Sequence, residues 1–246
     1  MNNKTIKFTA IDKHGWEVAP KPFPASQALP DWFTSMRPYD PHPADPNGTR
    51  PILEDRFSTV SPKKCMPMMD IMLNGYIIPL WSDVQIRPIK NPITAAEDPY
   101  VTWRTFKEVF QVHGETAKNV EAPVGYSKTV FKYMNKWHIK TPPGYSVLVT
   151  QPFGYRQSAF HAVPAIIDSD KSTLELIFPM WIKEGFDGIV EKGHPMVQII
   201  PFKRTDWNSE FNYFEDGEYE RIHDANFGST IVNHYIKKAW SKKRYS

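Results

Sequence analysis

Apolar residues along the chain form short runs separated by proline, glycine and polar residues, and long helical periodicity is scarce. Between residues 61 and 207 the runs include YIIPLW, YVTWRTF, TVFKYM, YSVLVTQP and PMVQIIPF. Runs spaced about 8–12 residues apart, with turn signals between them, are typical of a β-sandwich or barrel. Within TLELIF, Leu176 and Phe178 alternate with Glu175 and Ile177, as in a strand with one buried face. The pattern predicts a mainly β protein.

Three segments are predicted from changes in this pattern. Residues 1–60 read as a proline-rich N-terminal extension with short helical turns, and residues 61–207 as the β-rich core domain. Residues 208–246 read as an acidic, aromatic segment followed by a basic amphipathic helix that begins at Ser229. The predicted fold is a single β-sandwich, β-clip-like or jelly-roll-like domain with a few short helices and that C-terminal helix.

One short helix is predicted inside the core segment, over PMMDIMLNG. It begins at Pro67 and stops at Gly75, because glycine readily takes the left-handed conformation that ends a helix. Its methionines recur at helical spacing, which favours packing in a core over a cofactor site. Cys65, next to Met66 and close to these methionines, is expected to be a buried structural thiol.

Composition and charge narrow the range of partners. The net charge is +3, but residues 237–246 carry five basic and no acidic side chains, so the rest holds 25 basic against 27 acidic residues. Nucleic-acid binding is therefore not expected except through the basic C-terminal tail. A single cysteine suits a cytoplasmic location, or a virion assembled there, and no apolar run is long enough to span a membrane. A small molecule or a protein is the expected partner, and a homo-oligomer is left open.

Three stretches resemble an uncharacterised protein family of tailed bacteriophages, cyanophages among them, and of some bacteria. They are KCMPMMDIMLNGYIIPLWSDV, NKWHIKTPPGYSVLVTQP and DSDKSTLELIFPMWIKEGFDGIVEKGHPMVQIIPFKRTDW. The resemblance covers roughly residues 20–207 and carries no activity with it. Polar residues within these stretches, such as Lys140 and Gln198, are candidates for ligand binding, together with the aromatic residues Tyr145 and Trp181.

A second resemblance concerns the turn PAIIDSDKSTLELIF and the strand that closes the core. Both look like the C-terminal core of the dUTPase and dCTP deaminase families, which have a β-clip fold. In those enzymes an aspartate of this turn positions or activates water, which implies a catalytic role for Asp168, with Asp170 beside it. The family's Arg-Ser-Ser/Gly phosphate-binding signature and its glycine-rich C-terminal motif are missing here, and Lys171 replaces the expected aromatic residue. Ordinary turn chemistry of aspartate is the alternative.

A third constellation is of a metal-binding type. His113 and Glu115 lie two residues apart and would share one face of a strand, and His194 follows much later. Two histidines and one carboxylate hold Fe(II) in non-haem oxygenases. Arg204, ten residues beyond His194, is placed where such oxygenases grip 2-oxoglutarate. The same spacing also arises by chance among eight histidines.

The stretch EKGHPMVQIIPFKR is interpreted as a glycine turn that leads into a core strand. Gln198 lies among apolar neighbours and would need a hydrogen-bond partner if buried. Three functions remain open from the sequence. The first is small-ligand or nucleotide binding, with possible hydrolysis, the second is a virion-associated or host-modulating interaction protein, and the third is an Fe(II)/2-oxoglutarate oxygenase. The sequence names no cofactor and does not decide whether the protein is an enzyme.

Overall fold

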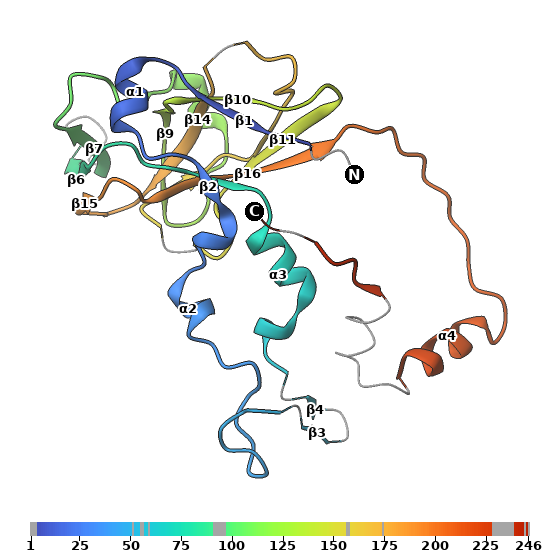
Figure 1. The fold of residues 1–246 in the computed structure, drawn as a ribbon. Helices are drawn as coiled ribbons and strands as arrows, with labels where there is room; N and C mark the ends of the chain where they lie inside the picture. Colours follow the sequence, from blue (N-terminus) through green and yellow to red (C-terminus); the bar gives the residue numbers. More distant parts are fainter. Residues whose placement is uncertain are drawn as a thin grey trace. The chain divides into compact units, whose positions relative to one another are not determined.

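Antiparallel strands dominate the computed structural model, and the mainly β prediction is confirmed (Figure 1). The chain forms two compact units, Met1–Ala28 with Asn74–Arg204 and Leu29–Leu73 with Thr205–Ser246. These units do not follow the three predicted segments, because residues 1–28 belong with the core strands and residues 61–73 do not. The structure describes residues 4–50, 52–54, 57–58, 60–90, 97–155, 158–173, 175–227, 239–243 and 245.

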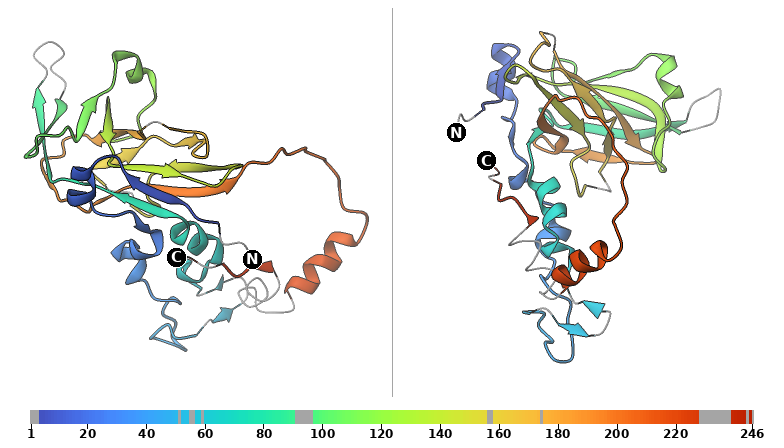
Figure 2. Two further views of the ribbon diagram at one scale, coloured as in Figure 1. Left: turned by 45° about the horizontal axis from the view of Figure 1, so that its top comes forward. Right: turned by 90° about the vertical axis from the view of Figure 1, so that its right-hand side faces the viewer.

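The first unit contains a five-stranded and a four-stranded antiparallel sheet, with no closed barrel among its described strands. The five-stranded sheet has the order β13 (Ala165–Ile167), β11 (Tyr145–Thr150), β16 (Pro195–Lys203), β5 (Tyr76–Pro79) and β2 (Phe23–Pro24). The four-stranded sheet has the order β12 (Phe160–Ala162), β14 (Ile177–Lys183), β9 (Tyr126–Met134) and β8 (Phe110–Val112). Figure 2 shows these strands from two further directions.

Smaller sheets complete the first unit. They comprise the pair β1 (Lys7–Ala10) and β10 (Trp137–Lys140), and the ribbon β15 (Gly188–Val190), β6 (Val84–Lys90) and β7 (Glu97–Trp103). Strands β1 and β2 fall within the predicted N-terminal extension and were missed. Strand β2 has only two residues, and β1 contains one large apolar side chain, Phe8, so neither forms an apolar run. Strand β1 pairs with the distant strand β10.

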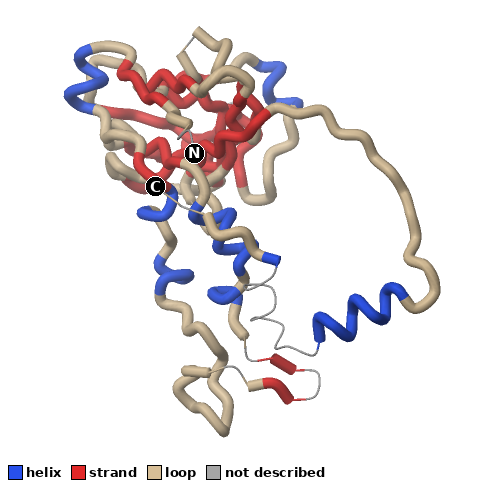
Figure 3. The backbone as a smooth tube through the Cα atoms, turned by 45° about the vertical axis from the view of Figure 1, so that its right-hand side comes forward, coloured by secondary structure: helices blue, strands red, loops and turns tan. Residues whose placement is uncertain are grey.

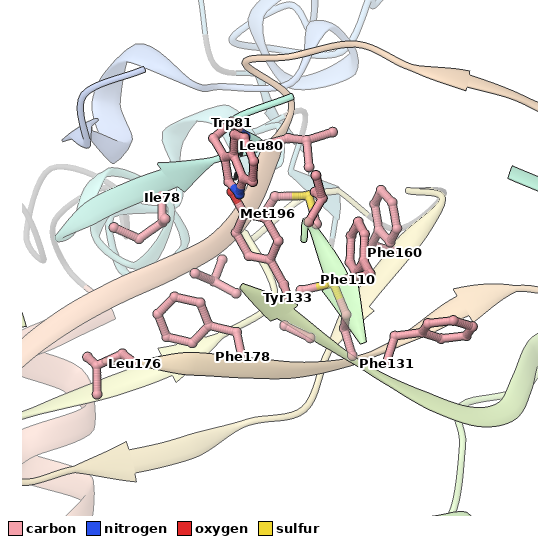
Figure 4. Packing of buried hydrophobic residues seen from close by; sticks show 14 of the residues in the cluster. Ile78, Leu80, Trp81, Phe110, Phe131, Tyr133, Phe160, Leu176, Phe178 and Met196 are labelled. Atoms are coloured by element: carbon pink, nitrogen blue, oxygen red, sulfur yellow. Dashed lines mark hydrogen bonds between the residues drawn. The ribbon is translucent and has the colours of Figure 1, made fainter. Parts of the chain in front are cut away.

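One apolar interior joins the two larger sheets, as expected of a β-sandwich. Val147 and Ile199 contribute from the five-stranded sheet, and Phe178 contributes from the four-stranded sheet. Figure 4 shows Tyr133 lying among Trp81, Phe110 and other buried side chains of this cluster. Alternation over residues 175–178 is confirmed by burial, although strand β14 begins only at Ile177.

Two helical elements of the first unit precede strand β5. Helix α1 (Lys13–Val18) begins at Asp12, whose carboxylate accepts a hydrogen bond from the backbone N–H of Gly15 at 2.5 Å. A 3₁₀ turn at Ala25–Gln27 follows β2. Gly75 then has a φ of +79°, and a Cβ atom there would lie 2.0 Å from the carbonyl oxygen of Ile199. Only glycine fits this position, next to the sheet.

The second unit holds mostly short elements. These are α2 (Asp31–Thr34), β3 (Leu53–Glu54), β4 (Phe57–Ser58), a 3₁₀ turn at Pro62–Lys64, α3 (Met66–Leu73) and α4 (Glu218–Phe227). The predicted helix before Gly75 is therefore confirmed as α3, and its Met72 is buried. Cys65 is exposed, which corrects the predicted buried thiol. The helix predicted from Ser229 lies largely outside the described residues.

The C-terminal tail of the second unit converges on one carboxylate of α3. Asp70 accepts hydrogen bonds from the indole Nε1 of Trp240 at 3.1 Å, from the Lys243 ammonium and from the Tyr245 hydroxyl. Burial and the neighbouring Asp70 carboxylate raise the pKa of Tyr245 well above its ordinary value, so this hydroxyl stays protonated and donates. We call this group of four side chains the tail latch.

Candidate functional site

Both aspartates of the predicted catalytic turn lie directly after β13 and accept several hydrogen bonds. Asp168 Oδ1 accepts from the Ser146 hydroxyl at 2.6 Å and from the Arg204 guanidinium at 3.2 Å. Asp170 accepts from the backbone N–H of Gly144 at 2.8 Å and from both terminal nitrogens of Arg204. The side chain of Asp170 is only 6% exposed. The turn is therefore held against the start of β11 and the residue that follows β16.

Arg204 is the centre of this group. Its Nη1 donates to the Ser146 hydroxyl at 2.8 Å and to the carbonyl oxygen of Tyr145 at 3.2 Å, besides its two aspartate partners. Its backbone N–H donates to the carbonyl oxygen of Gly144 at 2.9 Å, which continues the pairing of β11 with β16. The structure thus brings together four residues singled out in the sequence, Tyr145, Asp168, Asp170 and Arg204. We call this group the arginine clamp.

Electrostatics favour a structural role for the arginine clamp. The Arg204 guanidinium holds the pKa of Asp170 far below its ordinary value, and the Ser146 hydroxyl is the largest cause of the lowered pKa of Asp168. A general base works best when its pKa lies near the working pH. Both carboxylates are ionised at neutral pH and already engaged by donors. The arrangement therefore favours a fixed turn over the predicted catalytic role.

Gln198 lies in the middle of β16 and is 1% exposed. Its Oε1 accepts from the backbone N–H of Phe153 at 3.0 Å, and its Nε2 donates to the carbonyl oxygen of Asn74 at 2.7 Å. The expectation that a buried glutamine here needs partners is confirmed. Because both ends of the amide bind main-chain groups of other segments, Gln198 joins three parts of the first unit and is not open to a ligand.

The remaining predicted binding residues do not form one site. Lys140 lies on β10 and its ammonium is 3.5 Å from the carbonyl oxygen of Ser172, close to the turn of the arginine clamp. Trp181 lies on β14, is 4% exposed, and packs in a separate cluster with Tyr126 and Val130. Its indole Nε1 is buried without a partner. The predicted residues are thus divided between the arginine clamp, the main-chain contacts of Gln198 and the separate cluster around Trp181.

The predicted metal triad is wrong. Strand β8 ends at Val112, and Glu115 begins a 3₁₀ turn in which it pairs with Lys118 at 2.8 Å. His113 and Glu115 therefore do not share one face of a strand. Across the described ranges of the chain, no three His, Cys, Asp or Glu side chains are grouped so as to hold a metal ion. His194 lies elsewhere, in the turn before β16.

His194 instead contacts a serine that the sequence did not single out. Its Nε2 lies 2.9 Å from the Ser158 hydroxyl oxygen. The two residues line a surface pocket of about 480 Å³, whose other walls are formed by Ala159, Phe186, Ile189, Val190, Glu191 and Lys192. Burial lowers the pKa of His194, which keeps the ring neutral at pH 7. No sequence motif identifies this pair, because the two residues lie 36 positions apart and come into contact only in the folded chain.

A different kind of surface lies in the second unit. Residues 206–220 carry six acidic and no basic side chains, and they run as loop until α4 begins at Glu218 (Figure 3). Their aromatic side chains face solvent. The exposed fractions are 89% for Trp207, 92% for Phe211, 90% for Tyr213, 56% for Phe214 and 56% for Tyr219. We call residues 206–220 the acidic aromatic segment. The sequence signals it only by composition.

Comparisons with known proteins add no assignment to these sites. The chain matches no protein-family model, no curated protein and no solved structure. The resemblances to the bacteriophage family and to the dUTPase and dCTP deaminase group therefore stay predictions. Within the described residues, every helix is too short or too polar to cross a membrane.

Proposed function

We propose that this protein is an interaction protein that docks through the acidic aromatic segment onto a basic, apolar surface of a partner protein. The observation that carries the proposal is the exposure of Trp207, Phe211 and Tyr213 along one stretch that bears only negative charge. This role corresponds to the virion-associated or host-modulating interaction protein considered from the sequence. Ligand binding at the predicted polar residues is less favoured, because main-chain groups and ion pairs already occupy them.

The aromatic side chains supply the affinity. An aromatic side chain buries about 150–250 Å² in an interface. At roughly 25 cal/mol per Å² of apolar surface, burying 150 Å² of Trp207 contributes about 4 kcal/mol before the cost of ordering the segment. Tryptophan and tyrosine are also enriched among residues that dominate binding energy.

The carboxylates supply orientation and selectivity for the partner. A surface with six like charges attracts an oppositely charged surface and speeds the encounter at low salt. It also disfavours acidic partners such as nucleic acids. The partner surface is therefore expected to combine lysine or arginine side chains with apolar pockets that accept aromatic rings.

Selection of displayed random peptides against the full chain tests this proposal. Peptides that bind are expected to be enriched in Lys and Arg together with apolar residues, and to bind more weakly as salt is raised. The triple variant W207S/F211S/Y213S should lose binding at least tenfold. The matched control Y100S removes an aromatic residue that is 53% exposed on β7 and should retain it.

Three outcomes contradict the proposal. Selected peptides without excess positive charge would remove the electrostatic argument, and equal binding by the triple variant would remove the aromatic one. A concentration-dependent dimer that dissociates in the triple variant would instead identify a second copy of the chain as the partner.

A further inference from the structure

The Ser158–His194 pair has the geometry of a nucleophile and its base. The Ser158 hydroxyl oxygen lies 2.9 Å from His194 Nε2 and accepts a second contact from the backbone N–H of Phe160 at 3.3 Å. Because the Phe160 N–H can only donate, the hydroxyl proton is free to point at Nε2. A nucleophile and a base within about 2.6–3.2 Å of each other form one part of the signature of an activated serine.

The backbone holds both residues in place. Two main-chain hydrogen bonds to Leu80 fix the backbone of Gly193 and His194. The Gly193 N–H donates to the Leu80 carbonyl oxygen, and the Leu80 N–H donates to the His194 carbonyl oxygen, each at 2.8 Å. The Ser158 carbonyl oxygen accepts from the buried Tyr126 hydroxyl at 2.9 Å. Gly193 has a φ of +95°, which glycine takes without strain and which forms the turn that presents His194.

The pocket next to the pair suits a small apolar acyl group. Its volume of about 480 Å³ lies within the range of ligand pockets, about 300–1,000 Å³. Ala159, Phe186, Ile189 and Val190 supply apolar walls, while Glu191 and Lys192 are exposed at its edge. An ester whose acyl chain lies against the apolar walls would place its carbonyl carbon near the serine.

We propose that Ser158 and His194 cleave carboxylic esters of short apolar acids in this pocket. The Ser158 oxygen attacks the carbonyl carbon while its proton passes to His194 Nε2. The C–O bond to the leaving group breaks, and Nε2 returns the proton to the departing alkoxide, which leaves as an alcohol. Water then attacks the acyl-serine through the same base, which releases the acid and restores the serine hydroxyl.

The full chain is tested with p-nitrophenyl acetate and p-nitrophenyl butyrate, and with a fluorophosphonate probe whose site of attachment is mapped by mass spectrometry. We expect ester turnover above buffer and a phosphonyl adduct on Ser158. S158A and H194Q should each lower turnover at least 100-fold, because general base catalysis contributes typically 10²–10⁴-fold. The control S127A removes another buried serine hydroxyl and should retain turnover.

Labelling of the unmodified chain by the fluorophosphonate tests the role of Ser158 even if S158A fails to fold. Absence of both turnover and labelling in the unmodified protein overturns it. An adduct on another residue overturns it equally, as does S158A that hydrolyses both esters at the unmodified rate. The docking variant W207S/F211S/Y213S should hydrolyse both esters normally, because its residues lie in the other unit.

Discussion

The Tyr133 hydroxyl offers the sharpest test of how the core is held together, and Y133F is expected to lower the free energy of unfolding by about 3 kcal/mol. Tyr133 lies at 0% exposure on β9, inside the main cluster (Figure 4). Its hydroxyl donates to the Pro79 carbonyl oxygen at 2.7 Å and accepts from the Trp81 N–H at 3.1 Å. Burial raises the pKa of this phenol well above its ordinary value, so it remains a donor at any ordinary pH.

The magnitude follows from the two main-chain groups that lose a partner. A buried polar group left unsatisfied costs about 1–3 kcal/mol, and two of them at moderate cost give about 3 kcal/mol. The phenyl ring keeps its contact with Phe110, whose ring centre lies 5.6 Å away, so the cavity left by one oxygen atom adds little. A loss of this size corresponds to a fall in Tm of about 6–12 °C for a unit of this length.

Urea unfolding followed by tryptophan fluorescence measures the change. The midpoint should fall while the m-value stays constant, because the surface exposed on unfolding is unchanged. Y100F is the matched control, since Tyr100 is 53% exposed and its hydroxyl should contribute less than about 0.5 kcal/mol. A loss below about 1 kcal/mol in Y133F would refute the view that this hydroxyl stabilises the end of β5 and the residues that follow it.

Three further predictions concern charge. Burial lowers the pKa of His194, so as the pH falls below 6.5 this histidine binds a proton more readily in the unfolded chain than in the folded one. The free energy of unfolding should therefore decline below pH 6.5. H194Q should flatten this decline, as measured by urea midpoints between pH 7 and 5. Arg204 lowers the pKa of Asp170, which stabilises the folded chain above pH 3.8, and this stabilisation is lost at lower pH. A lysine cannot make the two parallel hydrogen bonds, so R204K should be less stable at pH 7. R204K should also lose less stability than the unmodified chain below pH 3.8 in the same assay. D70N should release the tail latch and speed tryptic cleavage after Lys243, measured by mass spectrometry; an unchanged rate would contradict the latch.

Much of the strand content could be read from the sequence because short apolar runs are bounded by proline, glycine and polar residues. The runs WHIK, YSVLVT and PMVQIIPF correspond to β10, β11 and β16, and the helix before Gly75 ends where predicted. Strands β1 and β2 do not stand out, because β2 has only two residues and β1, KFTA, contains one large apolar side chain, Phe8. Their formation depends on the partner strand that folding brings alongside.

The sites depended far more on tertiary structure. Asp168, Asp170 and Arg204 stand out in the sequence, yet only the fold shows that Arg204 forms ion pairs with both carboxylates. His113 and Glu115 have the spacing of metal ligands, but the strand ends between them and their geometry is lost.

By itself, the sequence determined the β-rich class, the α3 helix and the acidic character of residues 206–220, because local pattern and charge are properties of neighbouring residues. Only the tertiary structure decided which polar groups are satisfied and which are open. In the folded chain both ends of the Gln198 amide bind main-chain groups, Ser158 lies against His194, and Trp207 is exposed. Hydrogen-bond satisfaction and solvent exposure depend on segments far apart in the chain, and no local pattern encodes them.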